Sequence, residues 1–154
     1  MPPREMPIRE LSDRIAIQDL LIRYTVAIDT KNYELLDTCF TPDAHVDYTT
    51  SGGTKGSYPE VRKWLEQVLQ VFPITMHFIS NTTVELDGDR ATARTYVINP
   101  MVFINPDDSR HIFTVGAYYN DQLVRSDQGW QIAERVEELA YMDGSLPQGL
   151  ELPS

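Results

Sequence analysis

The fold is decided by the second half of this chain, which runs TMHFISNTTVEL over residues 75–86 and RATARTYVINPMVFI over residues 90–104. In both stretches apolar and polar side chains alternate with a period close to two, as in strands that bury one face. Aspartate and glycine residues typical of tight turns separate the two stretches, and similar turn signals recur twice further along the chain. The pattern predicts four consecutive strands joined as antiparallel hairpins, over residues 75–86, 90–104, 110–125 and 130–141.

Toward the N-terminus the apolar period changes to that of an α-helix. Ser12 has the character of an N-cap with Asp13 in the first turn, and the pattern predicts a helix from there to about Lys31. One broad side of this helix is apolar and contains Tyr24. Asp29 falls on the same broad side, away from the other charges, so that this carboxylate needs a partner.

Between this helix and the strands, two more helices are predicted. A short helix over residues 33–40 is followed by a turn at 41–43 and a strand at 45–48. A capping box over residues 57–60 opens the third helix, whose apolar side chains recur at helical spacing until Pro73 ends it. Helices gathered before a long antiparallel meander indicate an α+β domain, in which the helices cover one face of a curved sheet and leave room for a small-molecule pocket.

The domain organisation follows from composition. A chain of 154 residues with 42% hydrophobic residues fits one globular domain, which we place at residues 11–143. Residues 1–10 hold prolines and charges without periodicity and are expected to form an N-terminal arm. Residues 144–154 are rich in proline and glycine, and we expect a tail that is ordered only if it docks on a neighbour.

Charge and hydropathy exclude several classes of partner. The formal net charge is −10, and such a surface repels nucleic acid and anionic membranes, whose binding depends on Lys and Arg. Apolar runs are far shorter than the roughly 20 residues that cross a bilayer. The first residues lack the apolar core of a signal peptide, and the single cysteine, Cys39, cannot form an internal disulfide. We therefore expect a cytoplasmic protein with no nucleic-acid or membrane partner.

Several common chemistries lack a motif in this sequence. The three histidines show no metal-ligand spacing, so no metal is expected. Cys39 lies in an apolar stretch and is interpreted as a buried small side chain rather than a nucleophile. Glycine-rich nucleotide loops and the serine nucleophile elbow are also missing, and we expect no cofactor.

A proton-transfer site is the remaining candidate. Asp29 lies near the C-terminal end of its helix, where the macrodipole disfavours a negative charge, and His77 lies in an apolar run of the first strand. A carboxylate that holds an imidazole fixes its tautomer and makes it a better general base. Tyr24 lies on the same helix side as Asp29 and can donate its hydroxyl to a substrate oxygen. The alternative is a structural pair with a core tyrosine.

Other polar residues carry weaker predictions. Arg135 either binds an anionic substrate group or pairs with Glu137 or Glu85. The acidic cluster of Glu134, Glu137 and Glu138 is interpreted as the solvated side of a strand.

The sequence resembles SnoaL-like domains of the nuclear-transport-factor-2-like superfamily over about residues 8–142. The resemblance rests on the helical run IQDLLIRYTVAID and on shorter motifs in the strands. These segments are residues 17–29, 39–44, 77–81, 85–96 and 129–135. The resemblance implies a cone-shaped α+β barrel, with a curved, mostly antiparallel sheet covered by three N-terminal helices.

Scytalone dehydratase and bile-acid 7α-dehydratase of this superfamily carry an Asp on the first helix and a His on the first long strand, which act as a dyad. Asp29 and His77 match these positions, and Tyr24 matches a tyrosine five residues before the Asp. The resemblance implies that His77 removes a proton, Asp29 orients it and Tyr24 hydrogen-bonds the substrate. Five further residues are expected at the substrate: Tyr96, Asn99, His111, Arg135 and Trp64.

The resulting hypothesis is a cofactor-independent lyase, a dehydratase that acts on a hydrophobic, oxygenated ring compound. Two alternatives stay open: a non-catalytic small-molecule-binding or assembly domain, and an isomerase that uses the same base. The residues that ketosteroid isomerases and limonene epoxide hydrolases of this superfamily use cannot be placed in the sequence. The family resemblance further implies a homodimer or a homotrimer.

Overall fold

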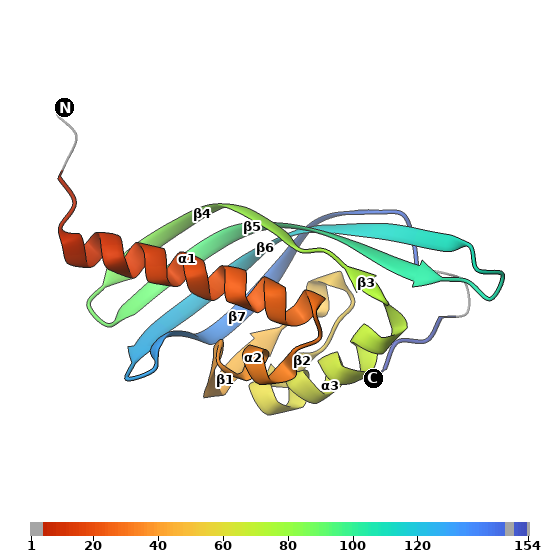
Figure 1. Cartoon of the computed structure of the whole chain (residues 1–154), viewed down its shortest axis with the longest axis horizontal. Helices are drawn as coiled ribbons and strands as arrows, with labels where there is room; N and C mark the ends of the chain where they lie inside the picture. The colour runs from red at the N-terminus through yellow and green to blue at the C-terminus, as the bar shows by residue number, and fades with distance from the viewer. Residues whose placement is uncertain (1–4, 147–149, 154) are drawn as a thin grey trace.

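A computed structural model of the chain describes residues 5–146 and 150–153. They form helices packed against one strongly curled sheet of seven strands (Figure 1). The helical elements are α1 (Ile8–Asp29), α2 (Tyr33–Asp37), a 3-10 turn η1 (Thr49–Ser51) and α3 (Tyr58–Val71). The strands are β1 (Phe40–Asp47), β2 (Lys55–Ser57), β3 (Ile74–Thr75), β4 (Phe78–Asp87), β5 (Arg90–Ile104), β6 (Arg110–Ser126) and β7 (Gly129–Asp143). The α+β fold class and the half-barrel shape of the sheet agree with the prediction.

The sheet is mostly antiparallel, as predicted, with one exception. The three hairpins β4–β5, β5–β6 and β6–β7 follow the turn signals of the sequence. β1, however, pairs in parallel with β7, so that the order across the sheet is β2-β1-β7-β6-β5-β3, with β4 also on β5. This parallel contact joins segments about 90 residues apart in the chain, a long-range pairing that local periodicity does not reveal.

α1 begins earlier than predicted. It starts at Ile8 rather than Ser12, so residues 8–10 of the expected arm are helical, and residues 1–4 lie outside the described residues. Asp13 is not a first-turn capping residue but is buried, where it accepts hydrogen bonds from Arg125 and from the Trp130 ring. This contact fixes the N-terminal half of α1 to β6 and β7.

The segment after α1 also departs from prediction. α2 ends at Asp37, and residues 41–43, predicted as a turn, belong to β1. β2 and η1 were not predicted. Cys39 is fully buried, as expected, although it lies between α2 and β1 rather than inside a helix.

The third helix agrees with its sequence signals. The Glu60 side chain accepts a 2.9 Å hydrogen bond from the Ser57 backbone, as in a capping box, and the helix stops two residues before Pro73. α1 lies across the strands, whereas α3 packs on β1 and β2 at one end of the molecule (Figure 1). The hydrophobic core fills the space between the helices and the concave face of the sheet.

Irregular pairing bends the long strands. The register of β6 and β7 shifts between Gly116 and Ala117, and the Tyr141 ring lies directly over Gly116. A Cβ at Gly116 would come within 2.0 Å of that ring, so any larger residue there requires the half-exposed Tyr141 side chain to move. Such bulges increase the local twist and help to curl the sheet.

The described part of the tail docks on its own domain. Leu146, Leu150 and Leu152 pack against the core, and the Pro153 carbonyl accepts a 2.8 Å hydrogen bond from the Trp64 ring. The described part of the tail thus contacts α3 of its own chain; residues 147–149 and 154 lie outside the described residues.

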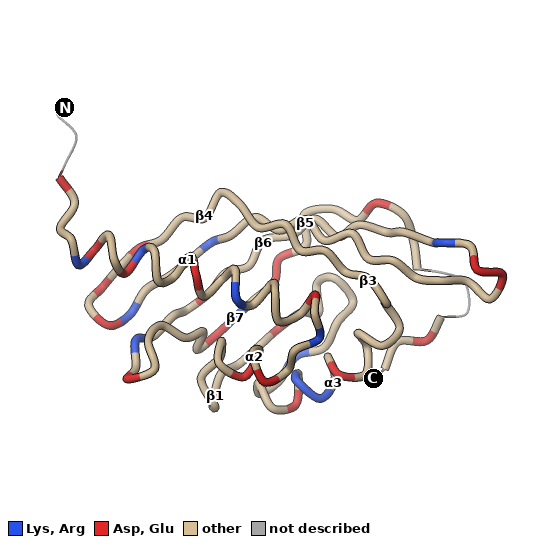
Figure 2. Tube along the Cα trace, viewed as in Figure 1, with Lys and Arg blue, Asp and Glu red and all other residues tan. Residues whose placement is uncertain are grey.

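Several charged side chains lie at the turns of the fold (Figure 2). Acidic side chains gather at the hairpin tips, as Figure 2 shows for the β4–β5 and β5–β6 turns. No helix in residues 5–146 and 150–153 is long and apolar enough to span a bilayer.

Candidate active site

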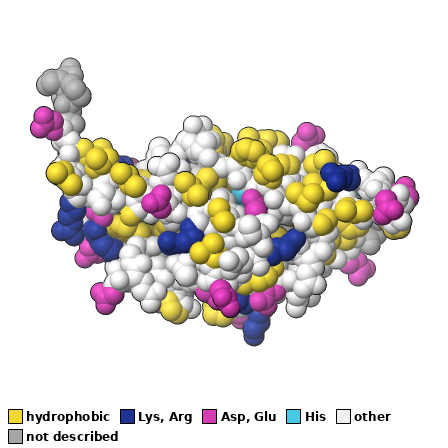
Figure 3. Space-filling model, viewed as in Figure 1, with side chains coloured by type: hydrophobic (Ala, Val, Ile, Leu, Met, Phe, Trp, Pro, Cys, Tyr) yellow, Lys and Arg dark blue, Asp and Glu magenta, His cyan; other side chains and the backbone are white. Residues whose placement is uncertain are grey.

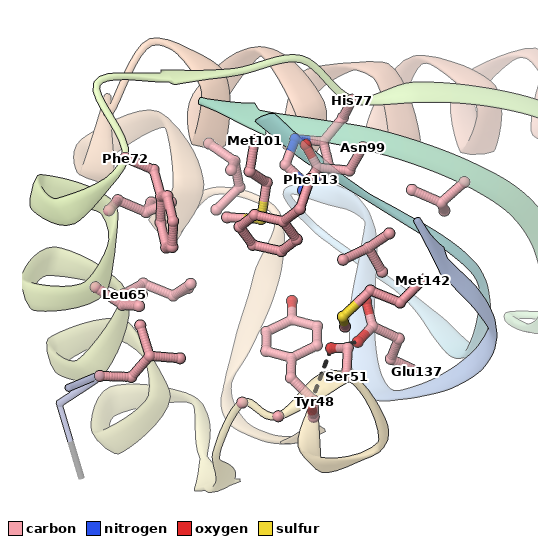
Figure 4. A pocket seen from close by; sticks show the side chains of 18 of the residues that line it. Tyr48, Ser51, Leu65, Phe72, His77, Asn99, Met101, Phe113, Glu137 and Met142 are labelled. Carbon is pink, nitrogen blue, oxygen red and sulfur yellow. Dashed lines mark hydrogen bonds between the residues drawn. The ribbon is translucent and has the colours of Figure 1, made fainter. Parts of the chain in front are cut away.

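A cavity opens between the concave face of the sheet, α1 and α3 (Figure 4). The empty space inside it, including the part open to solvent at its mouth, is about 820 Å³. Its walls are mainly aliphatic and aromatic, and few polar side chains point into it. The polar side chains include Tyr24, His77, Asn99 and Glu137, which come from four different segments of the chain.

His77 and Asp29 meet beside this cavity. The His77 ring nitrogen Nδ1 lies 2.6 Å from Asp29 Oδ1, and the His77 backbone N–H donates to Asp29 Oδ2 at 2.8 Å. The Thr75 hydroxyl adds a third hydrogen bond to Oδ1 at 2.8 Å. Three hydrogen bonds from two residues, His77 and Thr75, thus meet the expectation that Asp29 needs a partner.

The contact decides which His77 nitrogen can act. A carboxylate only accepts hydrogen bonds, so Nδ1 carries the proton and Nε2 keeps its lone pair. Nε2 forms no hydrogen bond within the described residues, and His77 lines the cavity. Burial acts to raise the pKa of Asp29, but the hydrogen bonds from His77 and Thr75, with the positive charge that His77 carries when its ring is protonated, outweigh burial and lower this pKa. Asp29 therefore stays ionised beside the imidazole.

Local backbone chemistry explains how His77 reaches Asp29. The pairs Thr75–Met101 and Phe78–Ile98 share one register, which places His77 opposite Asn99 on the inner face of β5. Pro100 has no N–H and cannot donate to the neighbouring strand. Met76, opposite Pro100, still donates its N–H to the Pro100 carbonyl at 3.2 Å. Because ladder hydrogen bonds alternate along an antiparallel pair, the N–H of the next residue, His77, points away from β5 and bonds the carboxylate at the end of α1.

A cluster of tyrosines forms another wall of the cavity. The hydroxyls of Tyr24 and Tyr48 share a hydrogen bond of 2.8 Å, and the Tyr119 ring packs edge-on against Tyr24. Burial raises the pKa of Tyr24 despite the nearby Arg135 and the tyrosine hydrogen bonds, so its hydroxyl remains protonated. Tyr24 lines the cavity, and its proton is available to a ligand when Tyr48 is the donor in the hydrogen bond between the two hydroxyls.

Arg135 does not line the cavity and is fully buried beneath the tyrosines. Its guanidinium makes two hydrogen bonds of 2.7 Å to Asp121 and lies 4.1 and 4.0 Å from the ring centres of Tyr24 and Tyr119. Its partner is thus neither a substrate anion nor Glu137 or Glu85. Arg135 holds the tyrosine cluster by cation–π contacts instead.

The other predicted substrate contacts divide into two groups. Asn99 and Trp64 line the cavity, and the buried Oδ1 of Asn99 has no hydrogen-bond partner within the described residues. Tyr96 lies on the opposite face of β5, where it packs against Tyr118. His111 lies outside the cavity lining, and its ring contacts the Ser145 carbonyl. The predictions for Tyr96 and His111 are wrong. The alternation of β5 puts Tyr96 on the outer face, whereas His111 shares the face of Phe113 and Val115 on β6 but lies further along the strand than the cavity lining reaches.

One titratable side chain of the cavity was not predicted from the sequence. Glu137 is buried and lines the cavity, whereas Glu134 and Glu138 of the same predicted cluster are exposed. The period of two along a strand places Glu137 on the opposite face from Glu134 and Glu138. Glu137 is two residues from the buried Arg135 and shares its face of β7. No group of three or more His, Cys, Asp or Glu side chains is placed to hold a metal within the described residues.

The model of the SnoaL-like domain family matches residues 9–136, and the chain belongs to this family. An uncharacterized protein of Mycobacterium tuberculosis is 44% identical over 136 residues, which cover 88% of this chain and 91% of the relative.

Solved structures share the fold. A candidate aromatic ring hydroxylase of Novosphingobium aromaticivorans superimposes with a TM-score of 0.80 at 28% identity, covering 92% of this chain and 96% of that one. A candidate scytalone dehydratase of the same organism gives a TM-score of 0.76 at 21% identity over the same shares of the two chains. At that identity the second likeness concerns the fold alone.

Proposed function

We propose that this protein is a cofactor-independent lyase of the dehydratase type, with His77 as the general base. The observation that carries the proposal is the hydrogen bond between His77 Nδ1 and Asp29 at the wall of an apolar cavity. It leaves Nε2 as a basic nitrogen facing the place where a substrate would lie. The dehydratase named among the structural neighbours supports the choice of reaction class through its fold.

The reaction begins with proton removal. Nε2 of His77 takes a proton from a carbon next to a carbonyl, and Asp29 stabilises the imidazolium that forms. Tyr24 donates a hydrogen bond to the carbonyl oxygen, on which negative charge develops. Loss of a hydroxyl from the next carbon then forms the double bond.

The cavity wall defines the substrate class. Its apolar lining favours a ring compound, and the unpartnered Oδ1 of Asn99 favours a substrate hydroxyl that donates to it. Trp64 offers an indole face to such a ring. We therefore propose a hydrophobic, oxygenated ring ketone as substrate.

The test uses 3-hydroxy-1-tetralone, an aromatic β-hydroxyketone that gives fluorescent 1-naphthol when it loses water. We expect the wild-type protein to catalyse the reaction and H77A and D29N each to lower kcat/KM by roughly 10²- to 10⁴-fold. H45A is the matched control, because His45 is exposed on β1 and does not line the cavity. Circular dichroism checks that each variant is folded.

Full activity of a folded H77A variant would contradict the proposal. Binding of 1-naphthol without turnover, measured by quenching of Trp64 fluorescence, would favour the alternative of a binding domain. The isomerase alternative predicts a product that retains the hydroxyl, which mass spectrometry distinguishes from 1-naphthol.

We also propose that the protein forms homodimers or homotrimers in the cytoplasm. Phe78 and Ile98 pair on the outer face of the sheet and are 59% and 48% exposed, and Tyr96 and Tyr141 extend this apolar surface. Figure 3 shows further hydrophobic side chains exposed along α1. Surfaces of this kind are typical of subunit contacts. Light scattering of wild type and of I98E tests the assembly, and an unchanged monomer mass in both would exclude it.

A further inference from the structure

Glu137 is a second acid–base group of the cavity, opposite His77. Figure 4 shows Glu137 near Ser51 and Tyr48, across the cavity from His77 and Asn99. It comes from β7, whereas His77 comes from the interruption between β3 and β4. A substrate in the cavity would lie between the two side chains.

The 3-10 turn η1 holds this carboxyl in place. The Thr50 hydroxyl donates to the Glu137 carbonyl at 2.9 Å and accepts from the Leu139 backbone N–H at 3.1 Å. The Ser51 hydroxyl contacts Glu137 Oε1 directly. Backbone and side chain of Glu137 are therefore both fixed by one turn.

Ser51 can serve either protonation state of the Glu137 carboxyl. Its oxygen lies within hydrogen-bond distance of Glu137 Oε1 and of the Tyr48 carbonyl, the latter at 3.2 Å. The hydroxyl donates to an ionised Glu137, or donates to the Tyr48 carbonyl and accepts from a protonated Glu137. The contact is therefore kept in both states of a proton-transfer cycle.

The surrounding charges leave Glu137 without a counterion. Within residues 5–146 and 150–153 no cation forms an ion pair with it, because Arg135 on the same strand is paired with Asp121. Burial is the largest effect and raises the pKa of Glu137; Asp47 raises it too, and the Ser51 hydrogen bond, Arg135 and His77 lower it without reversing the direction. The buried tyrosine hydroxyls nearby remain neutral.

We propose that Glu137 is the general acid that protonates the departing hydroxyl, which assigns removal and delivery of protons to two different residues. The proposal rests on the function proposed above. His77 takes the carbon-bound proton, the C–H electrons form the C=C bond, the C–O bond breaks, and the oxygen leaves as water with the Glu137 proton. Transfer of the proton from the imidazolium back to the carboxylate completes the cycle, so that no oxidant or reductant is needed.

A pair of substrates separates the acid from the base. 3-Hydroxy-1-tetralone and 3-acetoxy-1-tetralone give the same 1-naphthol, but acetate is a stable anion that leaves without a proton. We expect E137Q to lower kcat for the hydroxy substrate by about 10²- to 10⁴-fold and to change it for the acetoxy substrate by less than about fivefold. H77A should lower both. E138Q is the matched control, since Glu138 is the exposed neighbour that pairs with Arg94.

Equal losses on both substrates, or no loss on either, would overturn the assignment. A readout that needs no turnover is the carboxyl carbon-13 NMR titration of Glu137, identified by its absence in E137Q. We expect a midpoint above the ordinary range of a glutamate, and a midpoint at or below that range overturns the proposal. If the wild-type protein converts neither substrate, the proposed function fails for this class, while the titration still decides whether Glu137 carries the proton.

Discussion

Asp29 and His77, 48 residues apart in the chain, are joined through both oxygens of one carboxylate, which bind the ring and the backbone N–H of the same histidine. The carboxylate therefore fixes the position of the histidine as well as its tautomer. Because Asp29 lies at the C-terminal end of α1, where the macrodipole opposes it, these hydrogen bonds are what keeps it ionised.

The hydroxyl of Thr75 contributes to this arrangement. T75V removes one donor from Asp29 Oδ1, so the pKa of Asp29 should rise and the free energy of unfolding should fall by about 1 kcal/mol at neutral pH. Because the pKa of Asp29 is lower in the folded than in the unfolded protein, its ionised carboxylate stabilises the fold at pH values above the unfolded pKa. This stabilisation is lost as the pH falls through the folded pKa. Urea denaturation at neutral and acidic pH measures both effects. T83V, at an exposed position of β4, should show neither.

The buried pair of Arg135 and Asp121 should be essential for folding. D121N leaves an unpaired guanidinium with no solvent contact, which costs about 3–5 kcal/mol. The double variant R135M/D121L removes both charges and should recover much of that loss. Chemical denaturation of the single and double variants gives the coupling energy between Arg135 and Asp121. Strictly additive losses of unfolding free energy would show that the two side chains are not coupled.

Glu137 should make stability depend on pH in the opposite sense to Asp29. Its folded pKa is raised, so its contribution is fully present below the ordinary value of 4.5 and is lost as the pH rises through the folded value. The stability of wild type relative to E137Q should therefore fall across that window and then level off. Urea denaturation over a series of pH values measures this difference in unfolding free energy. A difference that does not change with pH would contradict the prediction.

The C-terminal segment should loosen when Trp64 loses its indole N–H. W64F removes the hydrogen bond to Pro153, and amide hydrogen exchange at Leu150 and Leu152 should become faster by up to about tenfold, the equivalent of roughly 1 kcal/mol. W130F is the control, because the Trp130 ring donates to Asp13 instead. Unchanged exchange in W64F would show that apolar packing alone holds the segment.

The sequence by itself determined the elements whose signals are local. The capping box and Pro73 bounded α3, and the alternation with its turn residues gave the hairpins of β4 to β7. It also marked Asp29 as a carboxylate in need of a partner, since a charge on an apolar helix side is visible from periodicity. The apolar run around His77 made it the candidate partner, and the family resemblance strengthened that prediction.

Only the tertiary structure decided what depends on long-range pairing. The parallel contact of β1 with β7, the burial of Asp13 against Arg125 and the pairing of Arg135 with Asp121 join distant segments, for which one sequence holds no periodic signal. The curl of the sheet then determined which face of each strand lines the cavity. Successive side chains of a strand point to opposite faces of the sheet, so a shift of one residue moves a side chain to the other face. For this reason Asn99 and Glu137 line the cavity and Tyr96 does not.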